Sequence, residues 1–436
     1  MKKPHRLRPP REDLVDAVVL EVHGLVHDQG WLADRALERA LRRERGLWAN
    51  ERRAAAEAVY GLLRAQGQLD WLLGGAPDLV TRYAAWLVRS GGASPAEATR
   101  RLGVAAGPLA GLERAEARLA AVADPIERLS LEASLPRWIV ERFVAELGEG
   151  EARVLALALN SRAPLTVRSN LLRGDREALR VRLAAEGVGA EPTRHSPWGL
   201  VLDGRLNAFS LPAFREGLFE IQDEGSQLIA LACGARSGQI VVDACAGAGG
   251  KALALAAEMH NRGTLHALDS DADRLGEARR RARRAGVDNL RIRPIAAGPE
   301  ASAQLQDLAG RADLVLVDAP CSGLGALRRK PDARWRLTPE DPARFAGIQR
   351  ELLARFAALV RPGGRLVYAT CAIGRTENAE VADFAERELG LVPAPVAQTL
   401  GEERARALGA AGGRVELLPH RQGTDGFFFA VFERRK

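Results

Sequence analysis

Residues 240–251 decide the fold and read Ile-Val-Val-Asp-Ala-Cys-Ala-Gly-Ala-Gly-Gly-Lys. The first four residues form a short apolar run that ends in an acid, which is typical of a buried strand in a parallel sheet. The glycines that follow allow a tight turn whose backbone can lie close to a ligand. The Ala- and Leu-rich residues 252–257 predict a helix, so the turn lies at a helix N-terminus, where unpaired N–H groups face outward. Together these features predict a nucleotide-type cofactor site on a doubly wound sheet, although a lone Gly-x-Gly-Gly turn can also be purely structural.

The sequence around this stretch alternates between strand and helix patterns from residue 222 to the end of the chain. Such alternation predicts an α/β domain with a mostly parallel sheet covered by helices on both faces. A last strand, at 427–434, has no helix after it, so we expect it to pair antiparallel. The expected strands before it are 240–243, 263–269, 290–295, 313–318 and 364–370, and the expected helices are 251–259, 272–285, 342–360 and 378–388.

The chain before residue 222 divides into two parts. Residues 12 to about 145 carry apolar residues at helical spacing with short Gly- and Pro-containing breaks, which predicts a compact bundle of helices. Residues 150–220 predict a small α+β subdomain, and a sheet with one helix on it is a frequent RNA-binding scaffold. We therefore expect three domains, at 1–145, 146–222 and 223–436. The expected strands of the subdomain are 166–168, 199–202 and 217–221, with a helix at 175–186.

Composition narrows the class of protein. The chain has 436 residues, 47% of them hydrophobic, and no window approaches the roughly 20 uninterrupted apolar residues of a membrane span. Residues 1–13 are basic without a following apolar stretch, so we expect no secretory signal. We also expect the protein to be cytoplasmic and monomeric. The four cysteines lie far apart, which argues against a metal site and favours reduced thiols. The formal charge of +7 favours an anionic partner such as nucleic acid, or else reflects the codon bias of a GC-rich genome.

Asp269 completes the expected cofactor pocket. It ends the second strand, about 20 residues beyond the glycines, where a carboxylate can accept both hydroxyls of a ribose. This spacing suits a dinucleotide or S-adenosylmethionine, but a dinucleotide site would need G-x-G-x-x-G, and Lys251 at the helix start is unusual there. A methyl donor therefore fits better. The alternative is that Asp269 only caps the helix at 272–285.

Two thiols follow two further strands. Cys321 stands in D-A-P-C after the fourth strand, and Cys371 stands in T-C at the end of the fifth. The carboxyl ends of parallel strands meet at the ligand crevice, so this pair favours chemistry over two small buried hydrophobes. Cys245 is interpreted as filling space in the glycine turn, and Cys233 as a core residue.

A thiol pair beside a methyl donor predicts one reaction in particular. Carbon 5 of cytosine is too weak a nucleophile to attack a sulfonium methyl group. Addition of a thiolate at carbon 6 turns the ring into an enamine with electron density at carbon 5. Methyl transfer, loss of the carbon 5 proton and expulsion of the thiol would follow. An acid near ring nitrogen 3, such as Asp318, would stabilise the adduct, and Lys251 or nearby arginines would lower the pKa of the reactive thiol.

At these residues the sequence resembles the Sun/RsmB family of S-adenosylmethionine-dependent RNA cytosine-5 methyltransferases. The resemblance implies a Rossmann-like class I methyltransferase fold preceded by a NusB-like helical bundle and a small α+β linker subdomain. The stretch L-L-R-A-Q-G-Q-L-D-W-L-L at 62–73 is similar to that bundle. The most specific matches are D-A-C-A-G-A-G-G-K at 243–251, D-A-P-C-S-G-L-G at 318–325, R-R-K-P-D-A-R-W-R at 328–336 and T-C at 370–371.

The resemblance also implies a role for each matched position. Cys371 would attack carbon 6, Cys321 would assist release, and Asp318 would lie between methyl donor and base. The implied substrate is a cytosine of small-subunit ribosomal RNA, with no metal and no membrane involved. S-adenosylmethionine would be held by Cys245, Ala246, Gly247, Ala248, Gly249, Gly250, Lys251, Asp269 and Asp318. The RNA path would be lined by Arg328, Arg329, Lys330 and Arg336.

The sequence departs from the family at three positions. Ala248 replaces a usual proline, Ala372 replaces a serine beside the nucleophile, and Ala296 stands near where an acid commonly binds adenine. The last departure supports an alternative function, a non-catalytic NusB-like RNA-binding or antitermination protein with a decayed enzyme domain. A dinucleotide-dependent oxidoreductase is a third reading, which the glycine turn disfavours.

Overall fold

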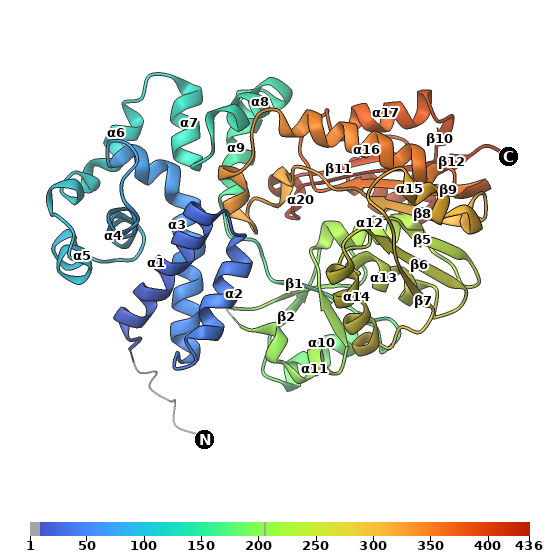
Figure 1. Cartoon of the computed structure of the whole chain (residues 1–436), viewed down its shortest axis with the longest axis horizontal. Coiled ribbons are helices and arrows are strands. Elements are labelled where there is room, and N and C mark those ends of the chain that lie inside the picture. The colour runs from blue at the N-terminus through green and yellow to red at the C-terminus, as the bar shows by residue number, and fades with distance from the viewer. Residues whose placement is uncertain (1–8, 205) are drawn as a thin grey trace. The chain divides into compact units, whose positions relative to one another are not determined.

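The structure is a computed structural model that describes residues 9–204 and 206–436. The chain forms two compact units (Figure 1). The first, the helical unit, contains the described residues up to Ser161 together with Leu327–Leu337. The second, the α/β unit, contains Arg162–Ala326 and Thr338–Lys436. Compactness thus places the first boundary after Ser161, whereas the sequence predicted it at residue 145. Of the basic stretch at 1–13, residues 1–8 lie outside the described part of the chain.

The N-terminal part of the helical unit is all-helical, as the sequence predicted. Its helices bury apolar residues that recur at helical spacing, such as Val59, Leu62 and Leu69 of α3. Helix starts are fixed locally as well, since Ser94 and Glu97 form a capping box at the start of α5. The helices are α1 (Glu12–Gln29), α2 (Ala33–Arg43), α3 (Ala49–Leu72), α4 (Leu79–Arg89), α5 (Pro95–Leu102), α6 (Ala115–Ala120), α7 (Pro125–Ala133), α8 (Arg137–Leu147) and α9 (Glu149–Leu159).

A small antiparallel sheet opens the α/β unit. Its strand order is β2-β3-β1-β4, and the three strands that the sequence predicted are present. The strand β2 was not predicted, because its three residues, Ala-Glu-Pro, carry no alternating apolar pattern. Val167, Leu200 and Phe219 form the core of this subdomain with Leu179 and Leu183 of the helix α10. The elements are β1 (Thr166–Ser169), α10 (Arg176–Ala185), β2 (Ala190–Pro192), β3 (Gly199–Leu202), α11 (Pro212–Arg215) and β4 (Phe219–Ile221).

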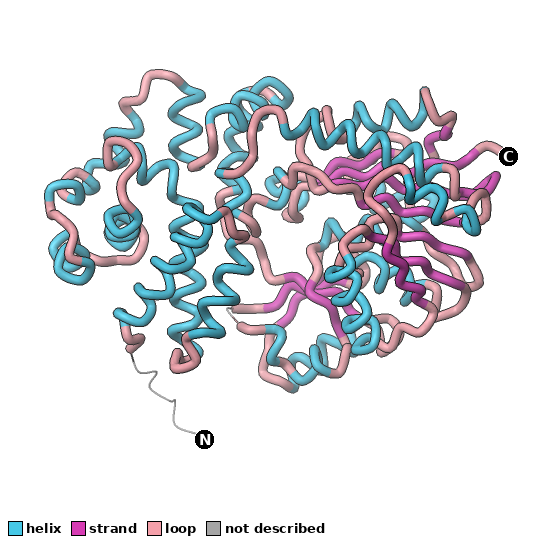
Figure 2. The backbone as a smooth tube through the Cα atoms, in the orientation of Figure 1, coloured by secondary structure: helices cyan, strands magenta, loops and turns pink. Residues whose placement is uncertain are grey.

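A larger, mostly parallel sheet follows, in the order β10-β12-β9-β8-β5-β6-β7, with β11 also paired to β12. Figure 2 draws the strands in magenta and the helices in cyan. The strands β5 to β9 pair in parallel, and β12 pairs antiparallel to β9, as the sequence predicted. The short strands β10 and β11 were not predicted. The strands are β5 (Ile240–Asp243), β6 (Thr264–Asp269), β7 (Leu290–Pro294), β8 (Ala312–Asp318), β9 (Val360–Thr370), β10 (Leu391–Pro393), β11 (Arg414–Leu417) and β12 (Phe427–Arg434).

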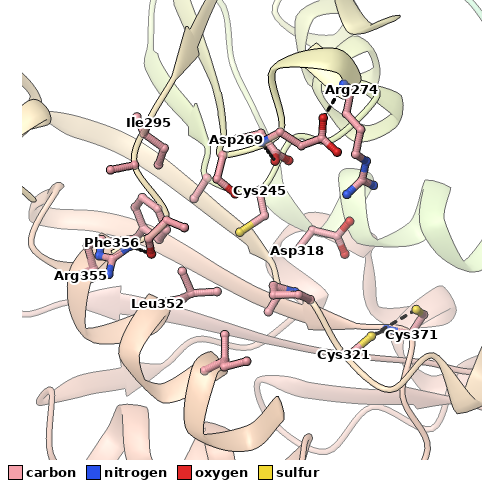
Figure 3. Close-up of a pocket in the computed structure, with 18 residues that line it drawn as sticks. Cys245, Asp269, Arg274, Ile295, Asp318, Cys321, Leu352, Arg355, Phe356 and Cys371 are labelled. Atoms are coloured by element: carbon pink, nitrogen blue, oxygen red, sulfur yellow. Dashed lines mark hydrogen bonds between the residues drawn. The ribbon is translucent and has the colours of Figure 1, made fainter. Parts of the chain in front are cut away.

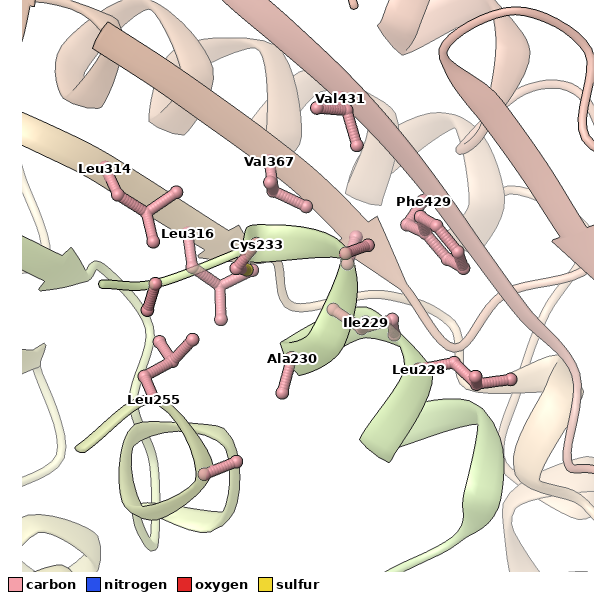
Figure 4. Close-up of a cluster of buried hydrophobic side chains, with 14 of the residues drawn as sticks. Leu228, Ile229, Ala230, Cys233, Leu255, Leu314, Leu316, Val367, Phe429 and Val431 are labelled. Atoms are coloured by element: carbon pink, nitrogen blue, oxygen red, sulfur yellow. The ribbon is translucent and has the colours of Figure 1, made fainter. Parts of the chain in front are cut away.

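Helices cover both faces of this sheet. On one face Ile229 and Cys233 of α12 pack against Leu316, Val367 and Phe429 of the strands (Figure 4), which confirms Cys233 as a core residue. On the other face α15, α16 and α17 cover the second core. The helices of this part are α12 (Glu224–Cys233), α13 (Gly250–Glu258), α14 (Ala272–Ala285), α15 (Glu300–Gln304), α16 (Asp341–Ala357), α17 (Ala379–Arg387), α18 (Ala397–Leu400), α19 (Glu402–Ala407) and α20 (Pro419–Gln422).

The topology of the sheet fixes where a ligand can bind. The chain runs from β5 to β6 and β7 in one direction and continues with β8 and β9 on the other side of β5. Ligands of such sheets bind outside the carboxyl ends of the strands, where the strand order reverses. Asp243, Asp269, Asp318 and Thr370 are the last residues of β5, β6, β8 and β9, so these four ends meet at one edge.

Within the described residues, we find no helix whose length and apolar character would let it span a bilayer.

Candidate active site

A cavity of about 450 Å³ opens at this edge of the sheet (Figure 3). Its lining combines carboxylates and thiols from the strand ends with apolar side chains from α16 and the segment after β7. The sequence-predicted residues Cys245, Asp269, Asp318, Cys321 and Cys371 all line it. The structure therefore brings the expected cofactor residues and both expected thiols to one cavity.

The two thiols lie directly against each other. The Sγ atoms of Cys321 and Cys371 are 3.2 Å apart, and the N–H of Cys371 donates to the Sγ of Cys321 at 3.3 Å. This proximity follows from the pairing of β8 with β9, which sets Asp318 opposite Ala369. The hydrogen bond with Cys371, followed by burial, raises the pKa of Cys321 well above its ordinary value. Cys321 consequently holds its proton more firmly than an ordinary thiol does.

Lys251 and Asp318 form an ion pair at the cavity. The Lys251 Nζ lies 2.6 Å from the Asp318 Oδ2, and the Lys251 side chain is 10% exposed. Burial disfavours the charge of Lys251, but the charge and hydrogen bond of Asp318 together with the charge of Asp243 outweigh it, so the pKa of Lys251 is raised. The charge of Cys371 contributes in the same direction. An ammonium group therefore stays charged beside Asp318 and near the Cys371 thiol.

The glycine turn is tied to Asp269. The N–H of Gly247 donates to Asp269 Oδ2 at 2.7 Å, and the N–H of Asp271 donates to Oδ1 at 2.9 Å. Asp271, not Asp269, caps α14, because its side chain accepts from the N–H of Arg274 at 3.0 Å. The alternative that Asp269 only caps this helix is therefore wrong. Gly247 has φ +52°, and a Cβ there would lie 2.6 Å from the Arg274 guanidinium, so the turn needs glycine.

Two arginines that sequence reasoning missed hold the carbonyls of the same turn. Arg281 of α14 donates to the Ala248 carbonyl at 2.8 Å, and Arg168 of β1 donates to the Gly250 carbonyl at 2.8 Å. Arg168 is 3% exposed, although it comes from the small sheet. The Arg-rich helix at 279–284 was visible in the sequence, but its pattern alone did not show which arginine faces the turn.

Asp243 is buried at the end of β5. It is 1% exposed, and neither carboxyl oxygen accepts a well-formed hydrogen bond from any described residue. Burial, together with the nearby charge of Asp318, raises the pKa of Asp243 to about 7. The carboxyl groups of Asp243 and Asp318 thus both act on the Lys251 ammonium group, and the Arg274 guanidinium lines the cavity beside Asp269.

The segment after β7 forms an apolar slot. Ile295, Ala296 and Ala297 line the cavity there, opposite Leu352 and Phe356 of α16. No side-chain carboxylate comes from Ala296, as the sequence already showed. The slot has the apolar character that suits a planar ring.

The segment at 328–336, expected to line an RNA path, belongs to the helical unit. Arg334 is fully buried, and its guanidinium donates to the Ser134 carbonyl at 3.0 Å and to Asn160 Oδ1 at 2.8 Å. The indole Nε1 of Trp335 donates to the Leu63 carbonyl at 2.9 Å. This segment is thus packed into the helical unit.

The four arginine and lysine side chains predicted for the RNA path differ in exposure. Arg328 is buried and its carbonyl accepts from Arg64 at 3.0 Å, whereas Arg329 is half-buried. Lys330 and Arg336 are exposed, and Arg336 pairs with Asp332 at 2.9 Å. A role of these residues in RNA binding stays a prediction.

The chain is similar to known proteins over most of its length. Residues 230–433 match the family described as 16S rRNA methyltransferase RsmB/F, and residues 135–208 match the ferredoxin-like domain of RsmF/B-like methyltransferases. The chain is 34% identical over 317 residues to the probable ribosomal RNA small subunit methyltransferase B of Bacillus subtilis, which covers 72% of this chain and 70% of the relative. It is 32% identical over 430 residues to the probable ribosomal RNA small subunit methyltransferase B of Synechocystis, with 92% and 95% covered. The chain belongs to the RsmB/F family.

Solved structures agree with this assignment. The crystal structure of PH0851 aligns over 98% of this chain and 100% of its own, with a TM-score of 0.77 and 25% identity. A methyltransferase homolog protein from Pyrococcus horikoshii aligns over 72% of this chain and 100% of its own, with a TM-score of 0.61 and 27% identity. The family resemblance and the Rossmann-like class I methyltransferase fold that the sequence predicted are therefore confirmed.

As a member of RsmB/F, the chain is an RNA methyltransferase of a family that acts on ribosomal RNA. The RsmB/F match begins within α12 and ends within β12, so it contains the glycine turn and both thiols. In the part of the chain that the structure describes, no three His, Cys, Asp or Glu side chains are grouped so as to hold a metal ion.

Proposed function

We propose that this RsmB/F chain transfers a methyl group from S-adenosylmethionine to carbon 5 of a cytosine in small-subunit ribosomal RNA, through a covalent bond between Cys371 and carbon 6 of the base. One observation carries the proposal. Two thiols in contact lie at a cavity that also contains the ion pair of Lys251 with Asp318 and, around Asp269, the part expected to bind the cofactor. A methyltransferase acting on a nitrogen or an oxygen needs no such thiol pair, whereas carbon 5 of cytosine must first be activated by addition at carbon 6.

The residues at the cofactor end fit S-adenosylmethionine. Each oxygen of Asp269 accepts one backbone N–H and keeps a lone pair for a ribose hydroxyl. The apolar slot of Ile295, Leu352 and Phe356 suits the adenine ring, although Ala296 offers no carboxylate to it. When bound, the cofactor supplies the electrophilic methyl group.

The thiols have unequal roles in this proposal. Cys321 holds its proton and Lys251 keeps a positive charge near Cys371, so Cys371 is the better thiolate and attacks carbon 6. Asp318, fixed by Lys251, accepts a hydrogen bond from the amino group beside ring nitrogen 3 and so holds the base in place for the addition. Loss of the carbon 5 proton to a base and breaking of the carbon 6–sulfur bond restore the aromatic ring, and Cys321 assists this release.

The competing function is a non-catalytic RNA-binding or antitermination protein. The missing acid near Ala296 favours it, and the thiol pair and the Lys251–Asp318 ion pair oppose it. Titration calorimetry with S-adenosylmethionine separates the two functions, because only the enzyme requires the methyl donor. The same titration with NAD tests the dinucleotide-dependent oxidoreductase.

The proposal is tested by incubating the purified chain with labelled S-adenosylmethionine and small-subunit RNA, either naked or in assembling subunits. The product nucleosides are then separated and weighed. We expect 5-methylcytidine at one position, and bisulfite sequencing of ribosomal RNA from a deletion strain should show that cytosine unmodified. A labelled methyl group found on another base, or on a nitrogen or oxygen atom, would overturn the cytosine chemistry.

A further inference from the structure

Two adjacent buried residues, Glu377 and Asn378, form hydrogen bonds with the two loops that carry Cys321 and Cys371. They lie directly before α17 and are 1% and 2% exposed. Sequence reasoning did not single them out, because an acid beside an amide at a helix start is typical of ordinary capping. Their contacts are instead directed at the loops that follow β8 and β9.

Glu377 holds the loop that carries Cys321. The backbone N–H of Ser322 donates to Glu377 Oε1 at 2.8 Å, and the Ser322 hydroxyl donates to Oε2 at 2.5 Å. Gln349 of α16 donates to the same Oε1 at 3.1 Å and to the Pro320 carbonyl at 3.0 Å. The residues on both sides of Cys321 are thus tied, directly or through Gln349, to one carboxylate.

Asn378 holds the loop that carries Cys371. The Thr370 hydroxyl donates to Asn378 Oδ1 at 2.6 Å, and the Asn378 Nδ2 donates to the Ala372 carbonyl at 3.2 Å. The residues before and after Cys371 therefore both contact the Asn378 side chain. Residue 372 is an alanine, and the polar side-chain contacts of this loop come from Thr370 and Asn378.

The two loops are also tied to each other. The N–H of Gly325, in the loop after β8, donates to the Cys371 carbonyl at 2.9 Å. Separately, the Tyr368 hydroxyl of β9 donates to the Glu377 carbonyl at 2.5 Å and holds the Glu377 backbone against the strand. Because Glu377 and Asn378 are adjacent in the chain and both side chains are held by hydrogen bonds, they link the Cys321 loop to the Cys371 loop over a short stretch of backbone.

We propose that Glu377 and Asn378 are positioning residues that set the spacing and direction of the two thiols for attack and release. This inference rests on the proposed function. A carboxylate buried without function would be costly, since burial of a charge is unfavourable unless donors surround it, and packing alone could be achieved by apolar residues. A misplacement of about 1 Å at a reacting atom can cost about a hundredfold in rate, so precise loop placement matters more to turnover than to binding.

The test compares Glu377→Gln and Asn378→Ser with Glu380→Gln, a control at an exposed residue of α17. For each variant we would measure kcat and KM with RNA, the Kd of S-adenosylmethionine by calorimetry, and the thermal midpoint. The expected result is a fall in kcat of about ten- to a hundredfold for both test variants, with the Kd of S-adenosylmethionine within about twofold of the parent. Glu380→Gln should match the parent. Asn378→Asp, which keeps the acceptor for Thr370, should recover part of the loss.

Two outcomes would overturn the inference. One is a kcat for Glu377→Gln and Asn378→Ser equal to that of the control. The other is a loss of kcat that only parallels a loss of folded protein, while Ser322→Ala, which removes the Glu377 contact from the hydroxyl alone, leaves turnover intact. The parent chain is assayed alongside. A parent that makes no 5-methylcytidine refutes the proposed function, whereas an active parent with active variants refutes only the positioning role.

Discussion

The effect of Gly67→Ala on the free energy of unfolding should change sign, from destabilising to stabilising, when Trp335 is replaced by alanine. Gly67 lies inside α3, and a Cβ at this position would lie 2.6 Å from Cη2 of Trp335. The indole ring cannot move away freely, because its Nε1 donates to the Leu63 carbonyl at 2.9 Å. The substitution therefore tests directly whether the segment at 327–337 packs into the helical unit, where the sequence had predicted an RNA path.

The expected magnitude combines two opposing terms. Alanine is better than glycine in a helix interior by about 1 kcal/mol. Forcing extra volume against a fixed ring costs about 1–3 kcal/mol, so Gly67→Ala should lower the free energy of unfolding by up to about 2 kcal/mol in the parent. In the Trp335→Ala background the next contact is Ser134 Oγ at 3.4 Å. There Gly67→Ala should raise the free energy of unfolding by about 1 kcal/mol.

The assay is calorimetric unfolding of the parent, the two single variants and the double variant, with the coupling taken from the cycle. Gly150→Ala is the matched control, because Gly150 lies in α9 and a Cβ there meets nothing within 4 Å. It should stabilise both backgrounds equally. If Gly67→Ala stabilised the parent as much as it stabilises Trp335→Ala, the packing of the segment against α3 would be refuted.

Three further predictions follow from the α/β unit. Arg168→Met removes a charged hydrogen bond from the Gly250 carbonyl and should weaken S-adenosylmethionine binding about tenfold by calorimetry. The control Arg279→Met, at an exposed position of α14, should leave the affinity unchanged. Equal affinities of the two variants would contradict the role of Arg168. Burial raises the pKa of Asp243 from 3.8 to about 7, so the native state binds the extra proton and the free energy of unfolding should fall as pH rises from about 4 to about 7. In urea titrations the free energy of unfolding of the parent should fall by about 4 kcal/mol over this pH range, and Asp243→Asn should abolish that fall. An unchanged pH dependence in the variant would argue against a protonated Asp243. The oxidant diamide should remove two thiols and activity together, reversibly with dithiothreitol, because the Sγ atoms of Cys321 and Cys371 lie 3.2 Å apart; activity that survives loss of both thiols would contradict their role.

Local patterns explain why much of the α/β unit could be predicted. The run at 240–251 carries strand, turn and helix signals within twelve consecutive positions, and the structure contains β5, the glycine turn and the start of α13 there. Cys321 and Cys371 could be placed together because parallel strands end at one edge. Spacing within one segment was sufficient for these inferences.

Contacts between distant parts of the chain were not predictable from the same patterns. Arg334 stands among basic residues that suggest phosphate contacts, yet its guanidinium is used by carbonyls of the helical unit more than a hundred residues earlier. Arg168 holds the cofactor turn from a different sheet, and Glu377 reaches the Cys321 loop across the end of β9. Side-chain direction decides these roles, and a single sequence does not show it.

The central claim is that Cys371 bonds to the RNA base and Cys321 assists its release. The most direct measurement is a denaturing gel of the Cys321→Ala variant incubated with small-subunit RNA and S-adenosylmethionine. We expect a slow-migrating protein–RNA band that resists denaturant in Cys321→Ala and is absent in Cys371→Ala. A stable band in Cys371→Ala instead would reverse the two roles, and no band in either variant would contradict covalent catalysis.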